Sequence, residues 1–315
     1  MKYRTTATTA LLAVMGTMYA TAPASAATTP PAVRLSGELV QVADQDGSGF
    51  AAIRLADSAF VPIKAEDVKG IASGSAVALD VVVPVDVRIA AAANRTLTTQ
   101  GADGKEIAVP LRSSDLAAAS DRSPASLTSA IGRATVAEAM APGTPPLEVS
   151  TVVTAAADPV STFTPATRQV YVAVVTPAGA TPQPVVDESR IRAQVDGASS
   201  YWSEVTGGRL KLGVATITGQ YTSAFNCSDP FGMWNEAAAK VGFTSAPNTS
   251  LVIELPPGIA ESPASNCSYG LGTIGTSPND SGALFTADDV WPVLAHELGH
   301  NISLRHADAL LPDRG

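Results

Sequence analysis

All three histidines of this 315-residue chain fall within eleven residues, and their spacing suits a metal site. They are His296, His300 and His306. Two histidines four residues apart lie on one face of a helix, so both imidazoles can reach the same ion. Glu297 follows the first of them, where a carboxylate beside the metal can act as a general base. The pattern predicts a zinc ion held by three imidazoles, with a water-activating acid beside it.

The helix predicted to carry these residues has an apolar back. Leu294, Leu298 and Ile302 recur every four residues and form one stripe, on the face opposite the first two histidines. A helix that continued to the third histidine would carry it about 9 Å beyond the second. Because zinc–nitrogen bonds are about 2.0–2.1 Å long, the chain must turn sharply before it. We therefore expect a helix packed on a core, with its histidine face in a cleft.

The run His296-Glu-Leu-Gly-His-Asn-Ile-Ser-Leu-Arg-His306 resembles the metzincin zinc-peptidase motif H-E-x-x-H-x-x-G-x-x-H. The histidines and Glu297 match position by position, and Ala307 follows the last of them, as in the gametolysin-type and reprolysin-like branches. Ser303 stands where the family has a glycine that makes the turn in the left-handed conformation, at a cost of about 1–2 kcal/mol for a serine. The alternative interpretation is a buried helix that contains the motif by chance.

The resemblance covers residues 168–308 and implies the upper subdomain of a metzincin catalytic domain. It also implies an edge strand before the zinc helix, in which Gly270, Leu271, Gly272 and Thr273 bind substrate by pairing with an extended peptide. An ordinary glycine-rich loop is the alternative. No methionine follows residue 233, so the family's methionine turn has no counterpart in this sequence. We expect a C-terminally truncated member, a degenerate member being the other interpretation. The His306 segment is expected to lack part of its usual support, so that the 315-residue form is inactive.

The N-terminus has the features of a secretory signal. Lys2 and Arg4 precede a short apolar core, and Ala24-Ser25-Ala26 is an A-x-A cleavage site, so residues 1–26 are predicted to be removed. After the signal, the sequence contains no run of eighteen apolar residues, so no membrane anchor is predicted. Two cysteines, Cys227 and Cys267, predict one disulfide in an exported chain, two buried thiols being the alternative. Scarce lysine and abundant alanine suggest a bacterial source.

The net charge argues against nucleic acid or an anionic membrane as a partner. It is −9 for the whole chain and −11 once Lys2 and Arg4 are removed, since the signal contains no acid. Protein or peptide is the substrate class that the motif implies. The oligomeric state is not indicated.

The rest of the chain divides into three segments. Residues 27–112 contain short alternating apolar runs and predict a small all-β pro- or accessory domain, with a hairpin turn at residues 44–49. Residues 113–167 are rich in Ala, Ser, Thr and Pro and predict a linker or activation region, partly helical within 113–141. Residues 168–315 predict an incomplete α/β (α+β) catalytic domain, in the order strand, helix, strand, helix, strand, zinc helix. The strands are expected at 39–42, 50–55, 60–63, 77–83, 170–175, 210–214 and 251–255, and the helices at 191–205 and 230–241.

These observations predict a secreted zinc-dependent endopeptidase with Glu297 as its general base. The alternative is a non-catalytic secreted binding protein with a vestigial or structural zinc site. No cysteine precedes Cys227, so a thiolate from the N-terminal segment cannot cover the metal. Asp288 and Asp289 are expected to cap the zinc helix rather than to bind metal.

Overall fold

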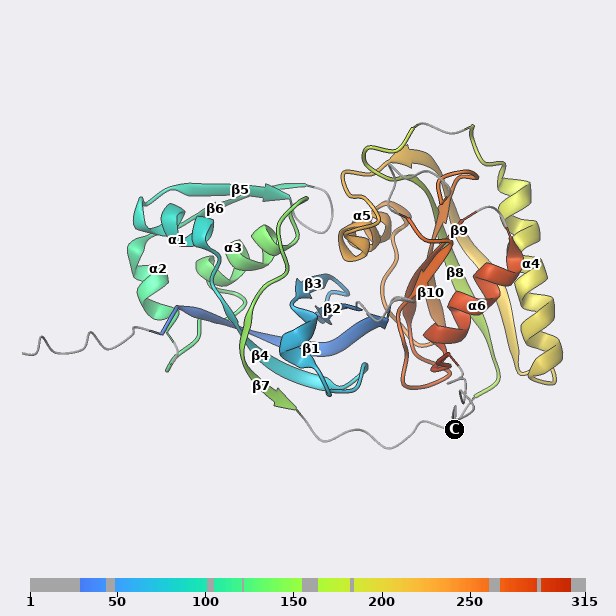
Figure 1. Cartoon of the computed structure of the whole chain (residues 1–315), viewed down its shortest axis with the longest axis horizontal. Helices are drawn as coiled ribbons and strands as arrows, with labels where there is room; N and C mark the ends of the chain where they lie inside the picture. Colours follow the sequence, from blue (N-terminus) through green and yellow to red (C-terminus); the bar gives the residue numbers. More distant parts are fainter. Residues whose placement is uncertain are drawn as a thin grey trace, which may run out of the picture.

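The computed structural model describes residues 29–43, 49–100, 105–120, 122–154, 164–181, 184–260, 267–287 and 290–306. These residues form two units that lie side by side (Figure 1). We call residues 29–154 the N-terminal unit and residues 164–306 the C-terminal unit. The predicted signal at residues 1–26 lies outside the described residues. None of the described helices is long and apolar enough to span a membrane.

The C-terminal unit is built on a mixed five-stranded sheet with the order β11-β12-β10-β8-β9. The four strands from β12 to β9 are parallel, and β11 pairs with β12 antiparallel at the edge. The strands are β8 (Ala166–Thr176), β9 (Leu210–Thr222), β10 (Thr249–Leu255), β11 (Gly270–Gly272) and β12 (Gly282–Ala287). Every residue of β10 and β12 is buried, as expected for central parallel strands covered on both faces.

Helices cover both faces of this sheet. Helices α4 (Glu188–Val205) and α6 (Trp291–Asn301) pack together on one face, and α5 (Pro230–Val241) packs on the other (Figure 1). The ends of α5 follow from the sequence, because Asp229 accepts a hydrogen bond from Gly232 N–H and Gly242 ends the helix with φ 65°.

The mixed α/β architecture of this unit is confirmed, as are its predicted strands and helices. Only β12 was not predicted. Its six residues form a short apolar run, and such a run carries no periodicity of its own.

The N-terminal unit contains an antiparallel five-stranded sheet with the order β3-β2-β1-β4-β7. The predicted strands are confirmed, and β1 and β2 pair as the predicted hairpin requires, although residues 44–48 lie outside the described residues. The strands are β1 (Ala32–Ala43), β2 (Gly49–Arg54), β3 (Phe60–Ile63), β4 (Ala76–Val82) and β7 (Val149–Thr154), with a separate ribbon of β5 (Thr96–Gln100) and β6 (Glu106–Pro110).

The prediction that residues 27–112 are all-β was wrong, because they also contain a 3-10 turn, η1 (Ala65–Val68), and a helix, α1 (Val85–Ala92). Two further helices, α2 (Ser113–Ala118) and α3 (Ala130–Ala139), lie within residues 113–141, where the sequence predicts partial helix. The linker prediction was wrong for residues 113–154, because α3 is buried in the core and β7 completes the sheet beside β4. Alanine-rich composition was interpreted as linker, yet alanine is the best helix former, and Ser129 caps α3 through Gly132 N–H.

The two units share part of one hydrophobic core. Phe60 of β3 packs against Phe231 and Trp234 of α5, with ring centroids 5.6 and 5.9 Å apart. Two buried hydrogen bonds join the same elements. The Phe60 N–H donates to Asn235 Oδ1 at 2.8 Å, and Asn235 Nδ2 donates to the Phe60 carbonyl at 2.7 Å. The N-terminal unit is therefore anchored on α5 by both apolar and polar contacts.

The predicted disulfide between Cys227 and Cys267 is present. Cys227 lies in the loop before α5, and Cys267 lies three residues before β11. The bond therefore ties the approach to the edge strand to the loop that begins α5.

Candidate metal centre

Helix α6 positions the first two histidines. Leu294 and Leu298 are fully buried against the sheet and α4, so the apolar back of the helix is where the sequence predicts it. His296 is exposed, and His300 is 9% exposed. The N-cap residue is Val290, which makes no side-chain capping hydrogen bond. Asp288 and Asp289, predicted to cap this helix, lie outside the described residues, and neither is its N-cap.

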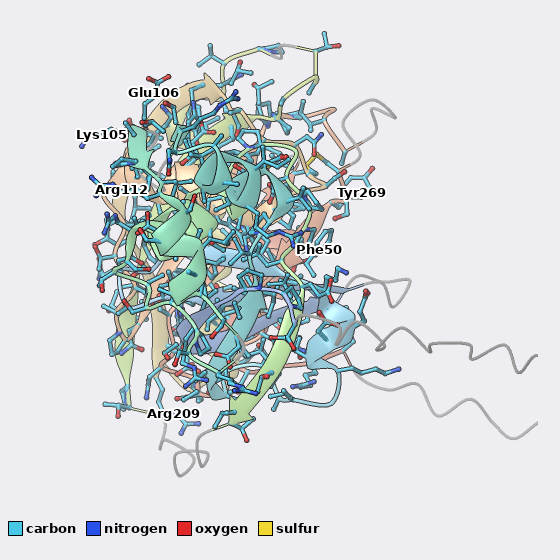
Figure 2. The ribbon with its side chains drawn as sticks, turned by 90° about the vertical axis from the view of Figure 1, so that its left-hand side faces the viewer. Phe50, Lys105, Glu106, Arg112, Arg209 and Tyr269 are labelled. Carbon is cyan, nitrogen blue, oxygen red and sulfur yellow. A yellow bond between two sulfur atoms is a disulfide. The ribbon has the colours of Figure 1, made fainter. Side chains whose placement is uncertain are left out.

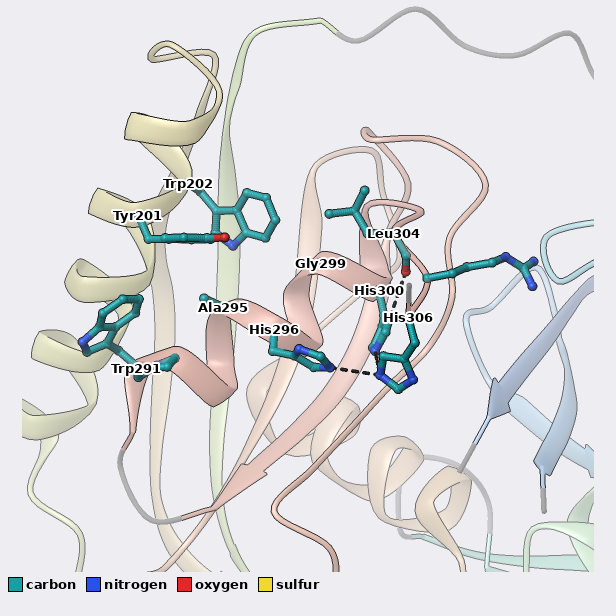
Figure 3. Close-up of a pocket in the computed structure, with 11 residues that line it drawn as sticks. Tyr201, Trp202, Trp291, Ala295, His296, Gly299, His300, Leu304 and His306 are labelled. Carbon is teal, nitrogen blue, oxygen red and sulfur yellow. Dashed lines mark hydrogen bonds between the residues drawn. The ribbon is translucent and has the colours of Figure 1, made fainter. Parts of the chain in front are cut away.

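The three imidazoles converge on one point (Figure 3). His306 Nε2 lies 3.1 Å from His296 Nε2 and 3.2 Å from His300 Nε2. One nitrogen from each ring lies within 4.8 Å of the others, so the cluster could hold a metal ion. The structure thus brings together the three residues that the sequence predicts as ligands.

The sharp turn predicted before His306 occurs at Ser303. Its φ is 79°, in the left-handed region that side chains other than glycine rarely adopt. Helix α6 has ended at Asn301, and two backbone hydrogen bonds hold the turn: Ser303 N–H to the His300 carbonyl at 3.0 Å, and Leu304 N–H to the Gly299 carbonyl at 2.9 Å. The segment expected to lack support is tied directly to the last turn of the helix.

The turn also orients His300. Its Nδ1 lies 2.8 Å from the Leu304 carbonyl, which can only accept, so Nδ1 carries the proton and Nε2 presents a lone pair to the cluster. Burial is the main cause that lowers the pKa of His300 and of His296, and the neighbouring imidazoles lower both further. Both effects favour the neutral imidazoles that a metal requires.

The donor set fits zinc. Three imidazole nitrogens with bonds of about 2.0–2.1 Å in a tetrahedral arrangement lie about 3.3–3.4 Å apart, close to the spacings of 3.1 and 3.2 Å in this cluster. Three histidine ligands with a fourth position open are typical of hydrolytic zinc sites rather than closed structural ones.

Glu297, the residue after His296, lies against the edge strand. It is 7% exposed, and burial raises the pKa of its carboxyl group to about 7. The side chain fits because β11 has no side chains where it lies. A Cβ on Gly270 would fall 2.4 Å from Glu297 Oε1, and one on Gly272 would fall 3.2 Å from Oε2. The two glycines therefore allow the carboxylate to contact the strand backbone.

The four residues predicted to bind substrate through their backbone differ in their side-chain surroundings. Residues 270–272 do form an edge strand, as the resemblance implies. The Leu271 side chain, however, is buried in the core shared with α5, and Thr273 Oγ1 accepts a hydrogen bond from Ala283 N–H at 3.0 Å. Among these four residues, only the backbone of Gly270 and Gly272 is placed to meet a ligand beside Glu297.

Sequence reasoning missed Asn301, which clamps α6 to the edge strand. Its side chain is fully buried, and Nδ2 donates to the Thr273 carbonyl at 3.0 Å and the Ala283 carbonyl at 3.2 Å. Its Oδ1 accepts from Ser250 Oγ at 3.0 Å. The signal was available, because Asn301 follows Leu298 by three residues on the apolar stripe. A polar side chain there needs buried partners.

An aromatic pocket of about 440 Å³ adjoins the histidines on the α4 side. Tyr201 and Trp202 of α4 and Trp291 of α6 form its wall (Figure 3). The spacing of Trp202 predicted its place on α4, but nothing in the sequence connected it with the histidines.

No protein-family model matches this sequence, and no curated protein matches it. The resemblance to the metzincins therefore rests on the sequence motif.

Proposed function

We propose that this protein is a zinc-dependent endopeptidase of the metzincin type, exported from the cell. The observation that carries the proposal is the convergence of three imidazole nitrogens on one point, with a buried glutamate next to the first histidine in sequence and packed against β11. Supporting it are the left-handed turn at Ser303 and the antiparallel edge strand β11, both implied by the family resemblance. The A-x-A site at residues 24–26 and the disulfide support export.

Each side chain has a role in peptide hydrolysis. His296, His300 and His306 would hold zinc, which supplies Lewis-acid polarisation of the scissile carbonyl and of the attacking water. Glu297 takes a proton from that water and delivers it to the leaving amine. The outward-facing backbone of Gly270 and Gly272 pairs with the substrate and holds it in extended form beside the carboxylate.

Metal analysis and cleavage assays test this proposal. The purified chain should contain about one zinc ion and cleave casein, and His300→Ala should lose both properties. Glu297→Gln is the matched control, since it should keep the metal and lose turnover. Undiminished zinc in His300→Ala would contradict the ligand assignment. Zinc bound at full occupancy without any Glu297-dependent cleavage would favour the alternative, a secreted binding protein with a structural site.

A further inference from the structure

The exposed edge of β11 does not remain open along its whole length. Thr273 N–H donates to the Ala283 carbonyl of the β12 side at 2.9 Å, so the backbone of the alternate residues, Gly270, Gly272 and Ile274, faces outward. This outward row is where an extended peptide would pair. A Cβ on Gly270 or Gly272 would meet Glu297, the residue that follows His296, so this end of the row lies against helix α6.

The third outward position is already occupied by the N-terminal unit. Ser73 Oγ donates to the Ile274 carbonyl at 2.9 Å and accepts from Gln41 N–H at 3.0 Å. The adjacent Gly74 approaches Thr276 so closely that a Cβ would fall 2.1 Å from its Cγ2. A peptide paired along β11 would therefore meet the N-terminal unit about 7 Å beyond Gly272, at about 3.4 Å per residue.

The same unit also reaches the opposite rim of the cleft. A small pocket of about 180 Å³ lies between its β1–β2 hairpin and the turn that carries the third histidine. Phe50 and Gln41 line it from the hairpin, Ile274 from the edge strand and Arg305 from the turn. Phe50 and Tyr269, which lies just before β11, point to the same flank of the molecule in Figure 2. The N-terminal unit therefore lies against both the segment after β11 and the turn that carries the third histidine.

The contacts that hold this end are firmly anchored. Besides the shared core at Phe60, Arg54 Nη1 of β2 donates to the Ser281 carbonyl at 3.1 Å, one residue before β12. Ser245 N–H donates to Ser58 Oγ at 2.9 Å. Because these part-buried contacts add to the shared core, moving the described part of β2 aside would break several contacts at once.

We propose that the N-terminal unit is the end wall of the substrate groove, with Phe50 and Ser73 as specificity-determining residues. This inference rests on the proposed peptidase function and deepens it. The N-terminal unit closes the groove about two residues beyond Gly272, and at the other end the Ser268 hydroxyl donates to the Gly270 carbonyl at 2.9 Å, a contact that a paired peptide would replace. The preferred substrates are peptides with only a few residues on the closed side, or longer chains that bend away there.

Two series of peptides test the wall in the zinc-loaded full-length chain. Both contain one quenched fluorescent core, extended by one to six residues at the N-end in one series and at the C-end in the other. We expect kcat/KM to fall at least tenfold in one series only, once the extension passes about three residues. Phe50→Ala should remove most of that fall, Phe50→Trp should bring it on at a shorter extension, and Val85→Ala, on the exposed face of α1, should leave it unchanged.

Binding measured without turnover separates this inference from the proposed function. Fluorescence anisotropy with Glu297→Gln should show the same dependence on length in its dissociation constants. Length-dependent binding without cleavage by the unmodified chain would support the wall and refute the peptidase. Cleavage with equal kcat/KM in both series would overturn the wall and leave the peptidase standing. Failure to bind or cleave any peptide would overturn both.

Discussion

Burial of the Glu297 side chain directly determines the pKa of its carboxyl group. A carboxyl group buried without a nearby cation is favoured in its neutral form, and its pKa is raised from 4.5 to about 7. The folded, metal-free protein therefore holds this proton between about pH 4.5 and 7, where the unfolded chain has lost it. A nearby metal ion would favour the charged form instead.

Glu297→Gln should consequently stabilise the metal-free protein in a pH-dependent way. Below about pH 4.5 the carboxyl group is neutral in both the folded and the unfolded chain, so its burial costs no charge desolvation. Between about pH 4.5 and 7 the free-energy cost of burying the charge rises. Above pH 7 it reaches about 3 kcal/mol, at about 1.4 kcal/mol per pKa unit. Urea unfolding with a chelator should show the advantage of the variant growing from pH 4.5 to 8. Glu204→Gln, which replaces an exposed carboxylate on α4, should show no such trend. An advantage that stays constant with pH would mean that the carboxyl group is not buried as described.

Ser303→Gly should stabilise the turn before the third histidine. A residue with a Cβ pays about 1–2 kcal/mol for a left-handed conformation, and glycine does not. We expect a gain of about 1 kcal/mol in unfolding free energy, less than the full strain because glycine loses more entropy on folding. Zinc affinity should rise several-fold. Ser303→Ala keeps the Cβ and should give no gain, and equal stability of the two variants would contradict the strain.

At the scale of single residues, the sequence predicts which three histidines come together but not the groups that hold them in place. The i, i+4 and i+10 positions of the three histidines are properties of the chain itself. The Leu304 carbonyl that orients His300 and the clamp at Asn301 depend on where the helix meets the sheet, which no local pattern encodes.

Among the elements, β11 and α6 together position the carboxylate of Glu297. The short strand is made of glycines on the side that receives Glu297, so the strand backbone and the carboxylate lie in direct contact.

Gly270→Ala should therefore reduce turnover while the metal stays bound. The new Cβ would fall 2.4 Å from Glu297 Oε1, and the carboxylate must move away from the strand. We expect kcat to fall at least tenfold with zinc content unchanged. Gly219→Ala in β9 is the matched control, because a Cβ there meets nothing within 4 Å. Normal turnover in Gly270→Ala would show that the position of the carboxylate against β11 is unimportant.

The elements of the C-terminal unit other than β12 were predictable, because most have a clear period or cap. Helix α4 shows the 3.6-residue repeat from Ile191 to Trp202, and α5 begins with Asp229-Pro230. In the N-terminal unit the helices α1 and α3 are short and rich in alanine, so their apolar faces have little contrast with their polar faces. Their stability comes from burial against the sheet, which the sequence does not display.

For the whole molecule, the interface at Phe60 and Asn235 should make the two units unfold together. Asn235→Ala removes two buried hydrogen bonds and leaves the Phe60 N–H and carbonyl unsatisfied, a loss of about 2–4 kcal/mol. Thermal unfolding should show one transition in the unmodified chain and a lower or split transition in the variant. Asn226→Ala, at an exposed turn, should change the midpoint much less.

Cutting the chain between Thr154 and Thr164 should not separate the units. An inserted protease site there would yield two fragments that co-elute in gel filtration, because the shared core stays intact. If the N-terminal unit inhibits, activity should rise only when the fragments are forced apart by denaturant. Fragments that separate freely after the cut would contradict the shared core.

The shared core also affects when the two units can fold during synthesis of the chain. Phe60 and Asn235 are 175 residues apart in the chain. At a synthesis rate of about 5–20 residues per second, the β3 side of this contact leaves the ribosome on the order of 10–30 s before its partner exists. During that interval the sheet face formed by Val40, Val42, Ala52 and Phe60, which packs on the C-terminal unit, has nothing to cover it. A nascent chain in this state is a natural client for a holding chaperone. For a protein proposed to be exported, that delay keeps the precursor loose enough to be threaded through a translocation channel.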